Sequence, residues 1–272
     1  MDLRRLVRGT IPWSRLEHVA LELTSRYDRE AVRVEFLDAD NWLSTPCVVD
    51  DEWFVKIVTP QNALVHALFT GARNIGAFSS GTEGFFEHFE SPVEMIEHEL
   101  EATITMRELG LNVPEPVDAF EVDEFGVLVL EYLPAYRTLD ELDPPAVRAR
   151  AAELFDALST MHDERLAHGD LRDENVLVYR DEIYFIDVTS VRDEGMAGAR
   201  SYDLACALAT LSPAIGPQDA VEAALEHYPI DQLLEARDFL DFVRLRPDHD
   251  FDAALVKGEI EKRASYRPPS RR

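Results

Sequence analysis

Residues 168–188 read HGDLRDENVLVYRDEIYFIDV, and no other stretch constrains the fold of the chain as strongly. Two apolar runs, NVLVY and IYFIDV, flank the turn-forming residues RDE, which is the pattern of a β-hairpin. Pairing of the runs brings Asn175, at the start of the first strand, beside Asp187, at the end of the second. Asp170 lies in the loop just before the hairpin. The sequence therefore predicts three oxygen-bearing side chains at one end of a small hairpin.

The chemistry of these three side chains indicates phosphoryl transfer. Mg²⁺ prefers hard oxygen ligands, takes few of them from protein and completes its octahedron with phosphate oxygens, so Asn175 and Asp187 are candidate metal ligands. Asp170 is a candidate catalytic residue because its carboxylate can hold or deprotonate an attacking hydroxyl group. We therefore interpret residues 168–175 as a phosphoryl-transfer loop.

Strands and helices are predicted in different halves of the chain. Alternating or apolar runs predict strands over 31–38, 42–50 and 52–58, and two more within 113–133. Helical periodicity predicts helices over 93–109 and 143–161, and after the hairpin over 201–211, 218–228, 231–243 and 251–263. The fold class is therefore α+β, with a β-rich first part and a mainly helical second part.

The loop also resembles a known family. His168-Gly-Asp170-Leu-x-x-x-Asn175 followed by Asp187 is similar to the catalytic loop and metal-binding aspartate of the protein-kinase-like superfamily. The triplet HGD, IDV in place of D-F-G, and the missing A-P-E resemble the atypical RIO kinases and the small KEOPS-associated kinase. Aminoglycoside and choline phosphotransferases share the HGD form. Asp203 in SYDLA resembles the aspartate that anchors this loop, and the 15 residues between Asp187 and Asp203 are too few for an ordinary activation segment.

The resemblance implies roles for residues outside the loop. WFVKIV is similar to the strand-three lysine motif, which implies that Lys56 contacts the α- and β-phosphates of ATP. Residues 93–109 resemble helix αC, and their spacing favours Glu99 over Glu101 as the partner of this lysine. VLVLEYL resembles the hinge, so the backbone from Glu131 to Leu133 is expected to bind adenine.

One family feature is missing. The stretch LDADNWLST, residues 37–45, lies where a glycine-rich phosphate cover belongs, yet it has no glycine. Asp38 and Asp40 would repel ATP unless they bind metal or turn outward, whereas the hydroxyl groups of Ser44 and Thr45 could bind phosphate instead. This departure keeps a nucleotide-binding pseudokinase scaffold, or a slow ATPase acting as a switch, among the alternatives.

The sequence leaves two classes of phosphoryl acceptor open, a protein and a small molecule. Arg172, two residues after Asp170, can neutralise charge on the γ-phosphate, and residues 60–92 stand where RIO kinases carry a flexible loop. Both features favour an ATP- and Mg²⁺-dependent RIO-like Ser/Thr protein kinase acting on a protein substrate. The alternative is a small-molecule kinase of the aminoglycoside or choline phosphotransferase type.

The resemblance implies a two-lobed kinase-like fold with four parts. These are an N-terminal helical extension (1–31), an N-lobe (32–133) with a flexible insertion at 60–92, a C-lobe (134–255), and a basic C-terminal tail (256–272). The tail carries six basic and two acidic residues, so it could bind RNA or a ribonucleoprotein, an acidic partner or the acidic surface of the chain itself.

Charge and cysteine content indicate the compartment. The 272 residues include 53 acidic and 27 basic ones, a net charge of −26 that disfavours broad nucleic-acid binding and suits a high-salt, halophilic cytoplasm. The chain has 24 arginines but only three lysines, and Lys56 is the only lysine before residue 257. Two cysteines without CxxC spacing predict neither disulfides nor a zinc site. Without a long apolar segment, we expect a soluble cytoplasmic protein that does not enter a membrane.

Overall fold

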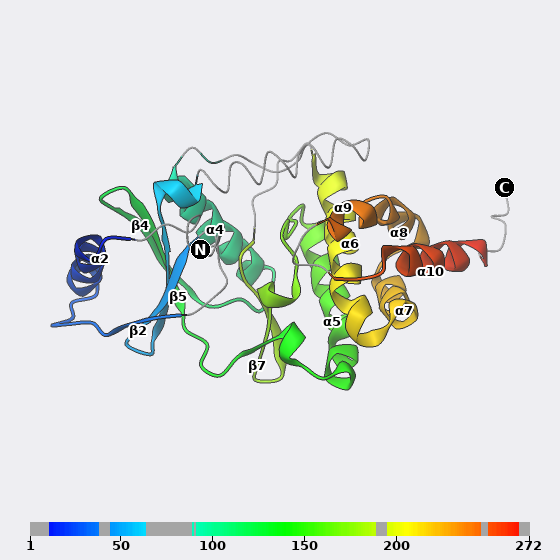
Figure 1. Cartoon of the computed structure of the whole chain (residues 1–272), viewed down its shortest axis with the longest axis horizontal. Coiled ribbons are helices and arrows are strands. Elements are labelled where there is room, and N and C mark those ends of the chain that lie inside the picture. The colour runs from blue at the N-terminus through cyan, green and yellow to red at the C-terminus, as the bar shows by residue number, and fades with distance from the viewer. Residues whose placement is uncertain are drawn as a thin grey trace, which may run out of the picture. The chain divides into compact units, whose positions relative to one another are not determined.

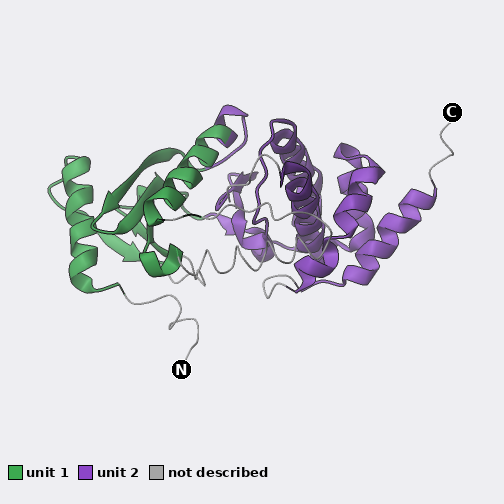
Figure 2. Ribbon diagram, turned by 90° about the horizontal axis from the view of Figure 1, so that it is seen from above, with its two compact units in different colours: residues 1–72, 88–105, 114–135 green, residues 73–87, 106–113, 136–272 purple. Residues whose placement is uncertain are grey.

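The computed structural model describes residues 11–37, 44–63, 89, 91–188, 195–245 and 250–266. These residues form two compact units, coloured separately in Figure 2. Unit 1 contains the described residues up to 105 together with 114–135, and unit 2 contains 106–113 and the described residues from 136 onward.

Unit 1 is built on an antiparallel sheet of five strands in the order β1-β2-β3-β5-β4 (Figure 1). The strands are β1 (Val34–Phe36), β2 (Thr45–Val49), β3 (Trp53–Val58), β4 (Pro116–Val122) and β5 (Phe125–Glu131). Asp50 and Asp51 turn the chain between β2 and β3 with positive φ angles of 56° and 57°, which aspartate tolerates better than most residues. The predicted meander of three strands is confirmed.

One face of this sheet is covered by helix α2 (Trp13–Arg26). Its buried residues Val19 and Leu23 pack in one cluster with Val55 and Ile57 of β3. Ion pairs surround this core: Arg15–Asp123, Arg26–Asp118 and Arg29–Glu52. The ring of His18 also contacts Asp123 at 3.0 Å. The predicted N-terminal helix is thus present over residues 13–26, and residues 1–10 lie outside the described part.

The other face of the sheet is covered by helix α4 (Pro92–Glu108). Ile96 of α4 packs with Leu128 of β5 in a second buried cluster. Gly126 is required where the helix begins, because a Cβ at this position would lie 2.5 Å from the carbonyl oxygen of Pro92. The predicted helix over 93–109 is confirmed, whereas most of the predicted insertion, residues 60–92, lies outside the described residues.

Unit 2 contains a bundle of helices (Figure 1). They are α5 (Pro144–Asp163), α6 (Met196–Ile215), α7 (Pro217–His227), α8 (Ile230–Arg237), α9 (Leu240–Arg244) and α10 (Ala253–Ser265). Asp143 caps α5 by accepting a hydrogen bond from the Ala146 N–H group at 3.0 Å, as Asp143-Pro144 in the sequence predicts. The α+β fold class is therefore confirmed, with the strands of unit 1 preceding the helices of unit 2.

The predicted hairpin is present as β7 (Val176–Tyr179) and β8 (Glu182–Phe185), joined to the short strand β6 (Arg137–Thr138). Short 3-10 helices at 139–141 and 173–175 flank these strands. Helix α5 holds the hairpin by two polar contacts, since Glu153 accepts a hydrogen bond from the Ile183 N–H group at 3.1 Å and Arg150 pairs with Asp181 in the turn.

The predicted single helix over 231–243 is wrong, because the structure has two helices there, α8 and α9. At the break the N–H groups of Asp238 and Phe239 bond three residues back, to Glu235 and Ala236, which tightens the turn. Phe239 then packs edge-on against Tyr202 with ring centroids 6.2 Å apart. Apolar spacing continues through the break, so periodicity could not reveal it.

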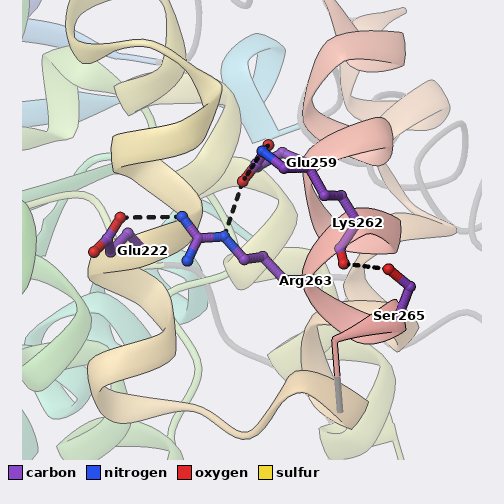
Figure 3. Close-up of polar contacts among 5 residues, drawn as sticks. All are labelled: Glu222, Glu259, Lys262, Arg263 and Ser265. Carbon is purple, nitrogen blue, oxygen red and sulfur yellow. Dashed lines mark hydrogen bonds and ion pairs between the residues drawn. The ribbon is translucent and has the colours of Figure 1, made fainter.

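The basic residues of the C-terminal region bind acidic residues of the same unit as far as the chain is described. Arg263 of α10 lies between Glu259, at 2.9 Å, and Glu222 of α7, at 3.1 Å (Figure 3). Lys257 pairs with Asp241 at 2.7 Å. Helix α10 also spans the predicted start of the tail at residue 256, and residues 267–272 lie outside the described part. Among the described helices, none is long and apolar enough to cross a membrane.

Candidate functional site

Lys56 and Glu99 form a buried ion pair in unit 1. The Lys56 Nζ atom lies 2.9 Å from Oε1 and 2.8 Å from Oε2 of Glu99, and the two residues are 4% and 7% exposed. The pair follows from strand alternation, because Val55 and Ile57 face α2 and Lys56 therefore faces α4. Of the two glutamates considered from the sequence, Glu99 is the one that contacts the lysine.

Ser44 and Thr45 face opposite sides of the sheet. Thr45 pairs with Ile57, whose side chain faces α2, so the Thr45 side chain lies on the face away from Lys56. Pro46 is directly opposite Lys56, and by alternation Ser44 lies diagonally next to Lys56 on its face. Ser44 is fully buried, and its hydroxyl group makes no hydrogen bond within the described part of the chain. Asp38 and Asp40 lie outside the described residues.

The segment expected to bind adenine ends strand β5. The N–H groups of Glu131 and Tyr132 donate hydrogen bonds within unit 1, to the carbonyl oxygens of Glu115 at 2.8 Å and of Glu52 at 2.9 Å. The N–H group of Leu133 makes no hydrogen bond to another described residue. Leu133 thus keeps a backbone donor that a ligand could use, next to a side chain that is 3% exposed.

The loop 168–170 in unit 2 is anchored by a buried carboxylate. Asp203 of α6 accepts hydrogen bonds from the backbone N–H groups of His168 at 2.6 Å and Gly169 at 2.8 Å. Gly169 has a φ of 76°, which glycine adopts without strain. Asp170 follows at once and is 8% exposed. The contacts of Asp203 are therefore those expected of an aspartate that anchors this loop.

The hairpin places Asn175 and Asp187 at its open end, as the sequence predicts. Val176 pairs with Phe185, and the N–H group of Ile186 donates to the carbonyl oxygen of Asn175 at 3.1 Å, which extends the ladder by one step. Asp187 comes next, with a φ of 59° that is uncommon outside glycine. Aspartate tolerates this backbone better than most residues, and Asp50 and Asp51 share it.

The oxygens of Asn175 and Asp187 suit a hard cation. The Asn175 Nδ2 group donates to the carbonyl oxygen of Asp170 at 2.8 Å, so the amide oxygen points the other way, with no hydrogen bond to any described residue. In the described part of the chain, no group of three or more His, Cys, Asp or Glu side chains could hold a metal ion. Two protein oxygens are nevertheless sufficient for Mg²⁺ when phosphate supplies further ligands.

The side chains of Arg172 and His168 lie next to Asp170. Arg172 lies with Nε 3.7 Å from Oδ2 of Asp170 and with Nη1 3.1 Å from Oε2 of Glu174. His168 is fully buried, and burial lowers the pKa of its imidazole although the charges of Asp203, Asp170 and Asp187 act in the opposite direction. The imidazole is therefore neutral near pH 7, in keeping with a residue that packs beneath the loop.

The sequence did not reveal His162 and Tyr228, which contact the anchor of this loop. The Nε2 atom of His162 lies 3.2 Å from Oδ2 of Asp203, and the hydroxyl group of Tyr228 lies 2.8 Å from Nδ1 of His162. The one available signal was a histidine directly after Met161 on the buried side of a helix. Tyr228, 66 residues away, gave none.

Similarity to known proteins agrees with this geometry. Residues 88–199, which contain α4, the hinge segment, the loop and the hairpin, match the family model of the RIO domain. Over these residues the match confirms the resemblance to the RIO kinases.

Individual proteins are similar to parts of the chain. The KEOPS complex subunit Bud32 of Pyrococcus abyssi (strain GE5 / Orsay) is 30% identical over 102 residues, which make up 36% of this chain and 45% of that protein. The chain therefore spans less than half the length of that relative. An aminoglycoside-3'-phosphotransferase of type VIII has a TM-score of 0.48 at 19% identity, over 82% of this chain and 97% of that one. The PknI kinase domain of Mycobacterium tuberculosis has a TM-score of 0.42 at 16% identity, over 86% and 95%.

Proposed function

We propose that the chain is an ATP- and Mg²⁺-dependent phosphotransferase, a RIO-like kinase that phosphorylates Ser or Thr hydroxyl groups of a protein. The observation that carries this proposal is the arrangement at the end of the hairpin. The backbone hydrogen bond between Asn175 and Ile186 brings the candidate metal ligands Asn175 and Asp187 to the same end of the hairpin. The side chain of Asn175 is oriented by its hydrogen bond to Asp170, the proposed base.

The residues divide the work between the units. Lys56, oriented by Glu99, binds the α- and β-phosphates, while the backbone of Glu131 and Leu133 binds adenine. The hydroxyl oxygen of the acceptor bonds to the γ-phosphorus while Asp170 accepts its proton. The bond from the γ-phosphorus to the β,γ-bridging oxygen breaks, and ADP leaves. Arg172, already close to Asp170, offsets the negative charge that develops on the transferred group.

Asn175 and Asp187 would hold Mg²⁺ through the free amide oxygen and a carboxylate. Bound there, the ion neutralises charge on the phosphates and fixes their position. This matters in a chain of net charge −26, whose surface field repels free ATP.

Ser44→Ala tests whether the Ser44 hydroxyl group binds phosphate in place of a glycine-rich loop. The hydroxyl group lies diagonally next to Lys56 and has no partner to lose in the described chain, so its removal is expected to leave the free energy of unfolding unchanged or slightly higher. The dissociation constant of Mg·ATP is expected to rise about tenfold, the effect of one hydrogen bond to a charged group. Isothermal titration calorimetry measures it.

Ser212→Ala is the matched control. Its hydroxyl group, in α6, is also buried without a hydrogen bond among the described residues, but it belongs to neither set of site residues. Its variant should bind Mg·ATP as the unmodified chain does. Equal affinity in the Ser44 variant and in this control would remove Ser44 from the proposed site.

Transfer of a radiolabelled γ-phosphate tests the function itself. The protein is incubated in high salt with labelled ATP and Mg²⁺, alone and with cell extract separated into macromolecular and small-molecule fractions. Label on Ser or Thr of an extract protein is the expected result. Label found only in a small molecule would assign the site to the small-molecule phosphotransferases.

Two further outcomes separate the remaining alternatives. Release of labelled phosphate without transfer, in every fraction, would indicate an ATPase that acts as a switch. Absence of turnover together with a thermal shift on adding Mg·ATP would indicate a nucleotide-binding scaffold. Absence of both would overturn the proposed function.

A further inference from the structure

Three buried side chains from separate helical regions form a hydrogen-bonded chain that ends at the loop 168–170. Tyr228, which follows α7, contacts Nδ1 of His162 in the last turn of α5 at 2.8 Å. The Nε2 atom of His162 contacts Asp203 of α6 at 3.2 Å. Tyr228, His162 and Asp203 are 5%, 2% and 0% exposed, so water does not compete for these bonds. Asp203 in turn holds the backbone of His168 and Gly169.

The hydrogen bond between His162 and Asp203 has a fixed direction. The Asp203 carboxylate accepts from two backbone N–H groups, and a carboxylate can only accept, so Nε2 of His162 must carry a proton to bond to it. When the imidazole is neutral, Nδ1 is an acceptor and the Tyr228 hydroxyl group donates to it. Burial, helped by the charge of Asp203, raises the pKa of the Tyr228 phenol, so this donor keeps its proton.

We propose that Tyr228 is a positioning residue: its hydroxyl group holds the ring of His162 in place, which aims Asp203 at the two backbone N–H groups that orient Asp170. This inference rests on the proposed function, in which Asp170 is the base. It adds a control point outside the site, because the end of α7 is thereby coupled to the geometry of the loop.

The hydroxyl group of Tyr228 can be removed without removing its ring. The ring packs edge-on against Phe155, with centroids 6.4 Å apart, and against His162, at 5.8 Å. Tyr228→Phe keeps these contacts and deletes one donor. The His162 ring then loses the contact at Nδ1 that holds its orientation, so the hydrogen bond from Nε2 to Asp203 loosens and Asp203 holds the loop less firmly.

Tyr228→Phe in the full chain is the test, read by NMR in high salt. The chain has 12 glycines and eight histidines, so selective ¹⁵N labelling of each type gives sparse spectra in which Gly169 and the His162 ring can be followed. In the variant we expect hydrogen exchange of the Gly169 amide to accelerate about tenfold, the effect of weakening one hydrogen bond. We also expect the ¹⁵N signals of the His162 ring to shift, because Nδ1 loses its hydrogen-bond partner.

Kinetics distinguish positioning from general support of the fold. With Mg·ATP, kcat is expected to fall about tenfold while KM for ATP stays within about twofold, since only the placement of the base changes. Tyr27→Phe is the matched control, because the buried Tyr27 hydroxyl group has no hydrogen-bond partner in the described chain. That variant should leave Gly169 exchange, the His162 signals and kcat unchanged.

A second pair of variants keeps the inference testable if Tyr228→Phe folds poorly. His162→Gln offers a donor to Asp203 and an acceptor to Tyr228, and should retain Gly169 protection, whereas His162→Leu should lose it. Unchanged Gly169 exchange and His162 shifts in Tyr228→Phe would overturn the inference, as would equal protection in the Gln and Leu variants. Because the NMR measurements need no turnover, they decide this point even if the chain transfers no phosphate.

Discussion

Asp170→Ala is expected to lower the rate of phosphoryl transfer about 10²- to 10⁴-fold, the range typical of losing a general base. Binding of Mg·ATP should survive, for a reason visible in the structure. The Asn175 side chain is held at 2.8 Å by the backbone carbonyl oxygen of Asp170, whereas the Asp170 carboxylate lies farther away, at 3.5 Å. Truncating the side chain therefore leaves the proposed metal ligand oriented. Single-turnover transfer and calorimetric titration measure the two effects separately.

Two comparison variants sharpen this test. Asp187→Ala should lose the Mg²⁺-dependent part of nucleotide binding, because it removes a proposed ligand. Asp173→Asn, in the 3-10 helix that also contains Asn175, should keep both binding and transfer. Burial and the charge of Asp140 raise the pKa of Asp173, so neutralising this carboxylate relieves repulsion and breaks no ion pair in the described chain. Full activity in both Asp170→Ala and Asp187→Ala would show that the site is assigned wrongly.

Local signals in the sequence were enough to predict the elements that carry the site. The alternation of Trp53-Phe-Val-Lys-Ile-Val set the face of Lys56, and the turn residues Arg180 and Asp181, both with positive φ, closed the hairpin that brings Asn175 and Asp187 together. These features depend on neighbours within a few residues, for which the periods of strands and the chemistry of turns are sufficient.

Contacts between distant segments were not predictable in the same way. Spacing along α4 favoured Glu99 over Glu101, but the contact of Glu99 with Lys56 became visible only in the structure. The sequence suggested that Ser44 and Thr45 were equivalent, although the strand register places them on opposite faces. The relay through His162 and Tyr228 depends on how three helices pack, and no pairwise spacing encodes that.

Lys56→Met is expected to lower the free energy of unfolding by about 3–5 kcal/mol, because it leaves the buried Glu99 carboxylate without its ammonium partner. Lys257→Met is the control: the same substitution breaks an ion pair with Asp241, whose side chain is 63% exposed, and should cost at most about 1 kcal/mol. Urea unfolding at two salt concentrations measures both. High salt should diminish the control effect and leave the Lys56 effect nearly unchanged, since buried charges are poorly screened.

The double variant Lys56→Met with Glu99→Leu separates stability from function. Replacing both partners of a buried pair by apolar residues of similar size is often neutral, so most of the lost stability should return. Mg·ATP turnover should not return, because the ammonium group that binds the phosphates is still absent. Recovery of turnover together with stability would reduce the pair to a structural contact. If Lys56→Met costs no more than Lys257→Met, the pair is not the buried, poorly solvated interaction that its geometry indicates.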